Sequence, residues 1–445
     1  MSDIVSSPPL QNIPRELTPG TRVRRDIGIN RRYAAERRFR ACGIAAVIFG
    51  LVFLVILVST VVRNGYTAFV QTSITLPIEF SEKVIDPTGK RTSDPKLLIS
   101  ANYSVLVRDA LVKMLGIDPA NRALVREATA MVSDSARIAL RDRVAANPSI
   151  VGTTQDVTFL ASANIDSANK GQIDLTADEK DRKVSDRQVA WMKQLRDSGA
   201  LYKAFNSGLF VSGNSSRPEA AGLGVALIGS LYLMLTVLVL ALPVGVAASI
   251  YLEEFAPKNR LTDLIEVNIN NLAAVPSIVY GLLGLSVFIN TMGLPRSASL
   301  VGGLVLSLMT LPMIIIATRS ALRAVPPSIR SAALGLGASR MQMVFHHVLP
   351  LAMPGILTGT ILGLAHALGE TAPLLLIGMV AFVANYPASP LDPSTALPVQ
   401  IYMWASEAER AFVERTSGAI IVLLFFLVAM NIGAILLRRR FERRW

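Results

Sequence analysis

Six apolar segments of this chain are each long enough to cross a lipid bilayer as a helix. A hydrocarbon core about 30 Å thick needs about 20 helical residues. With 51% hydrophobic and 17% charged residues over 445 positions, the chain is too apolar for an ordinary soluble protein. The sequence therefore predicts an α-helical polytopic membrane protein with six transmembrane helices, near residues 43–62, 221–250, 272–290, 300–318, 354–383 and 417–437.

Arginine is unevenly distributed among the short segments that flank these spans. Residues 1–43 contain nine arginines, residues 319–340 contain four and the tail 438–445 contains five. Because cytoplasmic loops carry an excess of Lys and Arg, both termini and the loop around Ser331 are predicted to be cytoplasmic. The first span is too long for a signal peptide and begins too far along the chain, so we expect a retained anchor.

The net charge of +12 is expected to lie mostly at the cytoplasmic membrane face. Headgroups there attract each nearby arginine by about 1 kcal/mol, so membrane lipid is the expected partner and nucleic-acid binding is the weaker interpretation. Residues 1–20 are rich in Ser and Pro and predict disorder, and Arg22 to Arg40 predict a helix on the membrane surface. Cys42 has no second cysteine to pair with and is expected to be inert.

Composition divides the chain into five parts. The segment after the first span is polar and nearly neutral, unlike its surroundings, which indicates a separate extracytoplasmic domain. The parts are a basic N-terminal segment (1–42), an anchor helix (43–63), the extracytoplasmic domain (64–215), a five-helix membrane domain with a cytoplasmic loop at 321–350 (220–437), and a basic tail (438–445).

The extracytoplasmic segment has the pattern of a small α+β domain. Residues 73–80 and 157–162 predict short strands. Asp118-Pro119 is a candidate helix start, followed by apolar residues at helical spacing as far as Ile138. Thr176 to Glu179 is a second capping signature, leading into apolar positions up to Leu201. In the membrane domain, the polar loop 385–415 is expected to lie outside and to include a short helix at about 398–408.

The loop before the fifth span predicts a helix–turn–helix plug without chemistry of its own. Small alanines begin a short helix, Gly335 and Gly337 permit a sharp turn, and Arg340 to Val348 restart a helix that Pro350 is expected to stop. Such a plug suits insertion into a cleft of another protein. Its candidate coupling residues are Ser331, Ala332, Ala333, Gly337, Ala338, Leu349 and Pro350.

This loop resembles the coupling loop of ABC-importer permeases, written Glu-Ala-Ala, three residues, Gly, nine residues, Ile-x-Leu-Pro. Gly337 and Leu349-Pro350 match the pattern, whereas Ser331 replaces the usual Glu and His347 the usual Ile. The resemblance implies that the loop couples the chain to an ATPase. Any salt bridge that the usual Glu makes to the ATPase has no counterpart at Ser331.

An enzyme would need an activated nucleophile, a carboxylate pair or a metal cluster. The three histidines, His346, His347 and His366, do not have HExxH spacing, and no GxxxxGK[ST] run is present to hold ATP phosphates. The first two histidines are expected to face solvent or a partner. We therefore expect no catalytic residue, no metal and no cofactor in this chain, with ATP and Mg bound by a partner subunit.

Glu370 is the one carboxylate within the predicted fifth span, where an acid is costly unless it is paired or faces water. His366 lies four residues earlier, on the same helix face. Together with Thr371 and Arg319, these residues are the candidates for a translocation pathway. Two alternatives stay open: Glu370 pairs with a basic residue of a neighbouring subunit, and Arg319 reaches the lipid headgroups, which we favour for Arg319. Gly359 and Gly363 form a GxxxG pair that indicates close helix packing.

Three further stretches narrow the resemblance. Leu272–Leu285, Leu322–Pro326 and the Gly-Glu-Thr-Ala-Pro-Leu-Leu run at 369–375 are similar to the PstA-type permease of the phosphate ABC importer. The likeness covers about 220–437, and the 64–215 segment resembles the extension of longer members. In such permeases the position of His366 is commonly Arg. The likeness implies a type I ABC-importer fold, an inner-membrane location, and assembly with a PstC-type permease, two PstB-type ATPases and a PstS-type phosphate-binding protein.

The resemblance also implies a function, the import of inorganic phosphate driven by ATPase movements that reach the spans through the 331–350 loop. An importer of sulfate or molybdate is the alternative within the same class. A membrane-anchored sensor that binds a ligand at 64–215 is the alternative from another class, although the predicted cytoplasmic parts are short. An intramembrane hydrolase would need a second acid or metal ligands beside Glu370.

Overall fold

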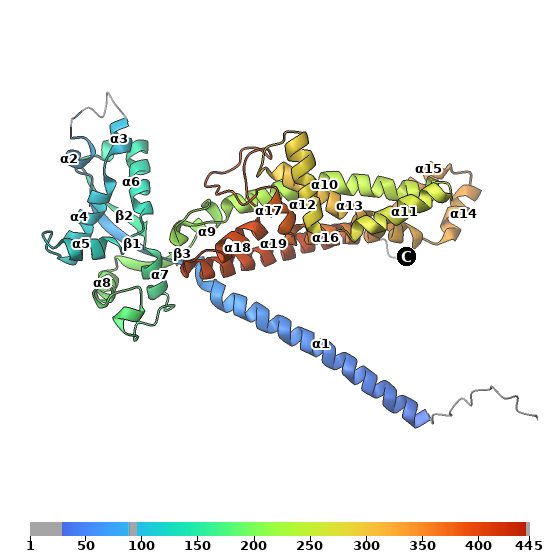
Figure 1. Ribbon diagram of the computed structural model, residues 1–445, viewed down its shortest axis with the longest axis horizontal. Coiled ribbons are helices and arrows are strands. Elements are labelled where there is room, and N and C mark those ends of the chain that lie inside the picture. Colours follow the sequence, from blue (N-terminus) through green and yellow to red (C-terminus); the bar gives the residue numbers. More distant parts are fainter. Residues whose placement is uncertain (1–28, 88, 90–95, 442–445) are drawn as a thin grey trace, which may run out of the picture. The chain divides into compact units, whose positions relative to one another are not determined.

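The computed structural model describes residues 29–87, 89 and 96–441 (Figure 1). The disorder predicted for residues 1–20, and the part of the predicted surface helix before Ile29, lie outside these residues. The chain divides into two units, Met1–Ser59 and Thr60–Trp445.

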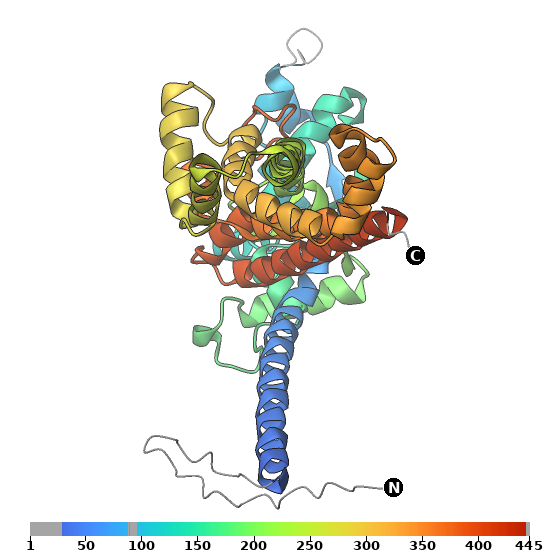
Figure 2. The same cartoon turned by 90° about the vertical axis from the view of Figure 1, so that its right-hand side faces the viewer.

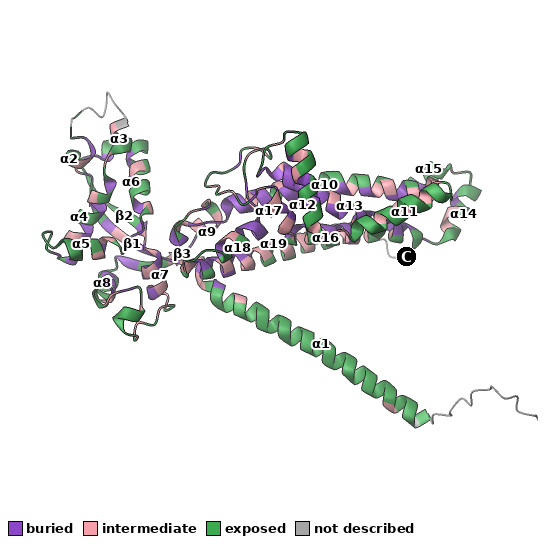
Figure 3. Cartoon of the chain, in the orientation of Figure 1, coloured by how far each residue is buried: buried purple, intermediate pink, exposed green. Residues whose placement is uncertain are grey.

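The basic stretch and the first span form one helix, α1 (Ile29–Gly65), of 37 residues. The separate surface helix expected up to Arg40 is therefore wrong from Ile29 onwards. The reason is that no proline interrupts residues 29–65, and Arg, Ala and Glu favour helix as strongly as the apolar run does. Most apolar side chains of α1 are exposed (Figure 3).

The polar segment after α1 folds as the predicted α+β domain, which we call the extension (residues 66–217). Its sheet has the order β2-β1-β3 with antiparallel pairs, from β1 (Val70–Glu79), β2 (Thr154–Leu160) and β3 (Leu201–Phe205). The first two strands confirm the predicted ones. The third was missed, because Leu201 was expected to continue a helix. The main sheet-covering helices are α4 (Tyr103–Leu115) and α6 (Ser135–Ala146).

Both helix starts predicted in the extension are wrong. Asp118 accepts from the N–H of Ala120 at 2.9 Å in a turn, and α5 (Arg122–Thr129) begins only after Asn121, whose side chain caps Leu124 N. Thr176 donates to Asp174 in another turn. A capping box of Ser185 and Gln188 starts the second helix, α8 (Asp186–Asp197). The remaining helices are α2 (Glu82–Ile85), α3 (Lys96–Ser100), α7 (Ala163–Asn169) and α9 (Gly208–Val211).

The membrane domain is a bundle of long apolar helices: α10 (Gly224–Ile250), α13 (Ser299–Arg323), α16 (Leu349–Gly369) and α19 (Ala411–Phe441). Helix α13 packs between α10 and α16, and α19 packs on α16; Figure 2 views α10 along its axis. Over the described residues, five helices including α1 are long and apolar enough to span a membrane, and a bent pair makes a sixth. This agrees with the predicted six spans.

The bent pair replaces the straight span expected at 272–290. Helix α11 (Arg260–Ala273) begins at its Asn259 cap and meets α12 (Ser277–Gly284), which continues as a π turn to Thr291, at an angle of 99°. The bend falls before Pro276, because a proline removes a backbone donor and disfavours helix in the residue before it. The Tyr280 hydroxyl donates across the bend to Leu272 O at 2.8 Å.

The fifth span also differs from its prediction of 354–383. It is continuous from Arg340 to Gly369, so Pro350 does not stop the helix. A π turn at Val344–Val348 ends two residues before Pro350 and accommodates its missing N–H. The helix ends at Gly369, and a short helix α17 (Ala372–Leu376) follows. The helix predicted at 398–408 is confirmed as α18 (Leu397–Ala405).

Gly359 lets α13 and α16 approach closely, which confirms the packing predicted from the GxxxG pair. A Cβ added at Gly359 would lie 2.2 Å from Cβ of Ala317, whereas one at Gly433 of α19 would meet nothing within 4 Å. We expect Gly359→Ala to lower stability by about 1–3 kcal/mol through overpacking. The matched Gly433→Ala is expected to leave the melting temperature of the purified protein unchanged or raise it. Equal melting temperatures for the two variants would contradict the close approach.

Candidate functional site

The predicted helix–turn–helix is present, and we call residues 327–348 the plug. Helix α14 (Pro327–Gly335) has a proline in its first turn, and Gly337 at φ +85° makes the sharp turn that follows. Ser339 and Gln342 then form a capping box that starts α15 (Arg340–Met343). The sequence folds this way because cap, turn and helix-forming residues stand in the required order.

The plug has one packed face and one uncovered apolar face. Ala333, Met343 and Val344 are buried in a cluster with the ends of α10 and α13. Leu336 at the turn is 91% exposed, and Leu334, Met341 and Phe345 are also exposed. Of the predicted coupling residues, Ser331, Ala332 and Gly337 are exposed, Ala333 is buried, and Ala338, Leu349 and Pro350 are half-buried. Exposed apolar residues gathered on one small element mark an interaction surface.

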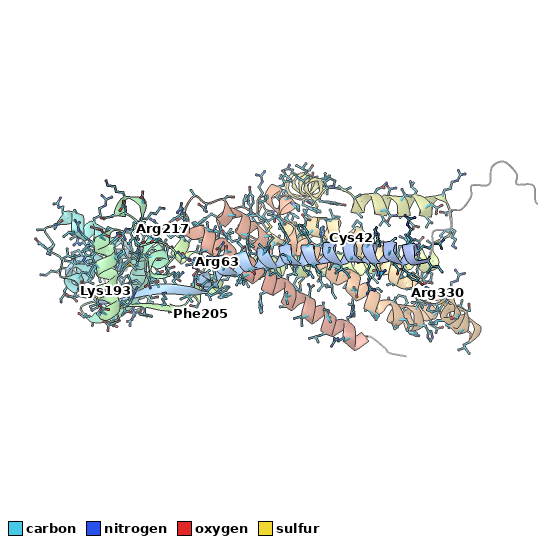
Figure 4. All side chains as sticks on the ribbon, turned by 90° about the horizontal axis from the view of Figure 1, so that it is seen from below. Cys42, Arg63, Lys193, Phe205, Arg217 and Arg330 are labelled. Atoms are coloured by element: carbon cyan, nitrogen blue, oxygen red, sulfur yellow. The ribbon has the colours of Figure 1, made fainter. Side chains whose placement is uncertain are left out.

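Arg330 fixes the plug to the bundle (labelled in Figure 4). Its Nε and Nη2 donate to both oxygens of the Glu254 carboxylate, the shortest distance being 2.7 Å. Nη1 also donates to Val325 O and Nη2 to Leu322 O, at 2.7 and 2.8 Å. The Glu254 side chain is 6% exposed, so this ion pair is largely withdrawn from water. All three guanidinium nitrogens are therefore engaged, in a fork geometry that lysine cannot reproduce.

A second ion-pair group holds Arg319. Its guanidinium contacts Glu266 at 2.9 Å and Glu253 at 3.4 Å, and its side chain is 10% exposed. Arg323 joins the same carboxylates. The expectation that Arg319 reaches the headgroups is therefore wrong, because acids from α11 and from the turn after α10 lie beside it. The signal in the sequence was Glu253-Glu254, directly after the second apolar segment.

The sequence predicted Glu370 within the fifth span. In the structure it lies at the end of a helix. It caps α16 with an extended backbone, φ −78° and ψ 128°. Its Oε1 is 3.3 Å from Nε2 of His366, so the predicted i,i+4 contact is present; the two side chains are 21% and 49% exposed respectively. Thr371 is the N-cap of α17 and is half-buried. Glu370, His366 and Thr371 thus lie together at the break, whereas Arg319 belongs to the other group.

The short helices that follow the two breaks of the membrane domain are in contact. Helix α12, which follows the first break, packs against α17, which follows the second. A Cβ added at Gly281 would lie 2.7 Å from Cα of Pro373. Non-helical backbone at membrane depth is tolerated where protein buries it or where it lines a water-filled cavity. Sequence reasoning missed this meeting, although a proline inside each apolar segment was visible.

His346 and His347 are exposed on the plug, as predicted. Over residues 29–87, 89 and 96–441, no group of three or more His, Cys, Asp or Glu side chains is arranged to hold a metal ion.

Known proteins resemble both halves of the chain. Residues 241–445 match the family described as binding-protein-dependent transport system inner membrane component, and residues 26–179 match a domain of unknown function, DUF3333. A probable ABC transporter permease protein, YqgI, of Bacillus subtilis (strain 168) is 35% identical over 211 residues, 44% of this chain and 70% of that protein. The phosphate transport system permease protein PstA 1 of Mycobacterium tuberculosis (strain CDC 1551 / Oshkosh) is 34% identical over 225 residues, covering 51% and 73%.

These matches agree with the bundle of apolar helices and make the chain a multi-pass inner-membrane protein. The type I importer permease fold expected from the resemblance is confirmed, together with a small α+β extension. The chain belongs to the PstA-type family of ABC-importer permeases.

Proposed function

We propose that this chain is the membrane-spanning permease subunit of an ATP-driven importer of inorganic phosphate. The proposal rests on two features of the plug. Its apolar face is uncovered, and its base is fixed to the bundle through Arg330 and Glu254. An uncovered apolar face accepts a partner, and a fixed base transmits its movement to the helices. The names of the relatives support phosphate as the substrate, and they do not favour sulfate, molybdate or a sensor role.

The proposed assembly follows from the family. The plug inserts into one of two PstB-type ATPases, which bind ATP and Mg, while this chain performs no covalent chemistry. A PstC-type permease completes the pathway, and a PstS-type protein delivers phosphate from outside. Both termini and the plug lie in the cytoplasm and the extension lies outside, as the arginine distribution favours. ATPase closure then switches the bundle between inward-open and outward-open states.

We propose that the two helix breaks line the pathway, with Glu370, His366 and Thr371 beside it. A carboxylate repels an oxyanion, so Glu370 does not bind phosphate directly. Its role is to hold His366 through Nε2, while the Nδ1–H of the same ring faces the pathway and donates a hydrogen bond to the anion, which requires both ring nitrogens to carry a proton. Assembly of purified chain with its four partner subunits tests the proposal: ATP hydrolysis should rise when phosphate-loaded PstS is added, and hydrolysis indifferent to it would count against an importer.

Replacing Glu370 by glutamine is expected to reduce phosphate uptake without loss of the complex. Glutamine keeps the shape but removes the charge that orients His366 at 3.3 Å. Uptake into vesicles and co-purification of the partner subunits are measured together, with Glu407→Gln, on an exposed loop, as the matched control. If the complex instead falls apart, Glu370 holds a neighbouring subunit and the pathway role is wrong.

A further inference from the structure

Five charged side chains are buried where the extension meets the membrane domain. They come from α7 and the residue after it, from the segment before α10 and from the first turn of α19. All five belong to the Thr60–Trp445 unit. We call them the junction cluster: Asp166, Lys170, Glu219, Glu414 and Arg415.

Lys170 bridges the two parts directly. Its Nζ lies 2.6 Å from Asp166 in the extension and 2.9 Å from Glu414 in α19, and the three side chains are only 2%, 5% and 7% exposed respectively. The other oxygen of Asp166 accepts from the N–H of Thr72 in the central strand β1, at 2.8 Å. A continuous buried path of charge-assisted hydrogen bonds therefore runs from the sheet of the extension into α19.

Glu219 forms a second connection, to the segment that enters α10. Its Oε1 accepts from the hydroxyl of Ser133 in the extension at 2.6 Å. Its backbone oxygen accepts from the Gln71 side chain of β1 and, at 3.3 Å, from Arg415 of α19. Arg415 is 2% exposed, and its guanidinium connects the segment before α10 to the N-terminal end of α19. The extension thus holds two membrane helices at their ends.

Close backbone packing accompanies these contacts near the start of α19. A Cβ added at Gly65 would lie 2.6 Å from the backbone of Ser417, and one at Gly418 would lie 2.6 Å from Cβ of Ala68. Phe412 of α19 packs on Trp404 of α18 in an apolar cluster that includes Ala68. A flexible tether would show neither backbone contact nor buried charge.

We propose that the junction cluster makes the extension and the near ends of α10 and α19 one rigid body, with Lys170 as a positioning residue for α19. Helix α19 packs on α16, whose C-cap is Glu370. The extension therefore sets the position of the helix that carries the candidate pathway residues. A partner that binds the extension from outside then acts on the membrane helices directly. The last step rests on the proposed function, whereas the rigidity does not.

The rigidity is tested by a distance measurement that needs no transport. Cys42 is the single cysteine of the chain and is replaced by serine, so that spin labels can be placed at the exposed Lys193 of α8 (Figure 4) and Tyr402 of α18. In the full-length protein the distance distribution is expected to be narrow, and to broaden in Lys170→Met. Since that variant leaves two buried carboxylates unpaired and can fail to fold, the neutral triple variant D166N/K170M/E414Q is measured beside it. A broad distribution without these changes, or a narrow one in every folded variant, overturns the proposal.

The positioning role is tested by ATP hydrolysis in the assembled complex, expressed per folded complex. Basal hydrolysis is expected to persist in the triple variant while its stimulation by loaded binding protein is lost. Arg187→Gln, which breaks a salt bridge to Glu127 inside the extension, is the control and should keep the stimulation. If the triple variant is fully stimulated, Lys170 has only a structural role. If the unaltered complex shows no stimulation while its distance distribution is narrow, the rigid body stands and the proposed importer function fails.

Discussion

Replacing Arg330 by lysine is expected to abolish phosphate uptake while ATP hydrolysis continues. Lysine keeps the charge but has one nitrogen where arginine uses three, so it cannot hold Glu254, Leu322 O and Val325 O at once. Each hydrogen bond to a charged group that is lost costs about 1.5–3 kcal/mol. The base of the plug would then move without carrying α10 and α13 with it, and the ATPase would be uncoupled from the bundle.

Arg260→Lys provides the control for this prediction. Arg260 is an exposed residue at the start of α11, on the same side of the bundle, and the same change of side chain there should leave uptake unaltered. Uptake and ATP hydrolysis are measured on one reconstituted preparation. Normal uptake by the Arg330→Lys complex would show that the fork between Arg330 and Glu254 does not transmit the movement.

Replacing Ala332 by aspartate is expected to abolish uptake by preventing the ATPase from binding. Ala332 is exposed in this chain and lies beside the buried Ala333, on the element whose apolar residues are uncovered. If the plug is buried in the ATPase, an aspartate there loses its water without gaining a partner, and an unpaired buried charge costs several kcal/mol. The chain itself should still insert, since the position faces solvent in the free subunit.

Ser331→Glu is the matched control, one residue away. The coupling-loop pattern that this loop resembles has Glu at this position, so a carboxylate there is expected to be tolerated. The measurement is co-purification of the ATPase with each variant from membranes that contain equal amounts of the permease. Equal recovery of the ATPase with Ala332→Asp would contradict insertion of the plug.

Much of the membrane domain was predictable because long apolar runs have few alternatives. The exceptions are where a proline lies inside such a run. Pro276 bends a span by 99° and Pro373 lies in the first turn of a separate short helix, whereas Pro350 is accommodated by a π turn. Each of these three prolines lacks a backbone N–H. Whether the helix continued depended on whether a neighbouring turn or side chain could compensate for the lost hydrogen bond. That information is three-dimensional, as the Tyr280 hydroxyl on Leu272 O shows.

The extension shows a different limit. Two of its three strands were predicted from apolar residues, whereas β3 was missed. Asp118 and Thr176 make local turns, while Asn121 and Ser185 cap the helices. All four residue types are favoured both at helix N-caps and in turns, so the sequence alone could not choose between them.

The ion pairs were the least predictable part of the candidate site. Glu254 and Arg330 are 76 positions apart and Lys170 and Glu414 are 244 apart, so only the fold brings them together. Their separate charges were visible, but pairing over such separations leaves no local pattern. By contrast, the contact of His366 with Glu370 follows from helical spacing and was predicted.

The most direct test of the account is ATP-dependent uptake of radiolabelled phosphate into vesicles that contain this chain with PstC-type, PstB-type and PstS-type partners. Sulfate and molybdate are added as competitors. Uptake is expected to require ATP and to be suppressed by excess unlabelled phosphate, whereas sulfate and molybdate should not suppress it. Uptake suppressed by either of those anions, or no uptake by an assembled complex that hydrolyses ATP, would contradict the account.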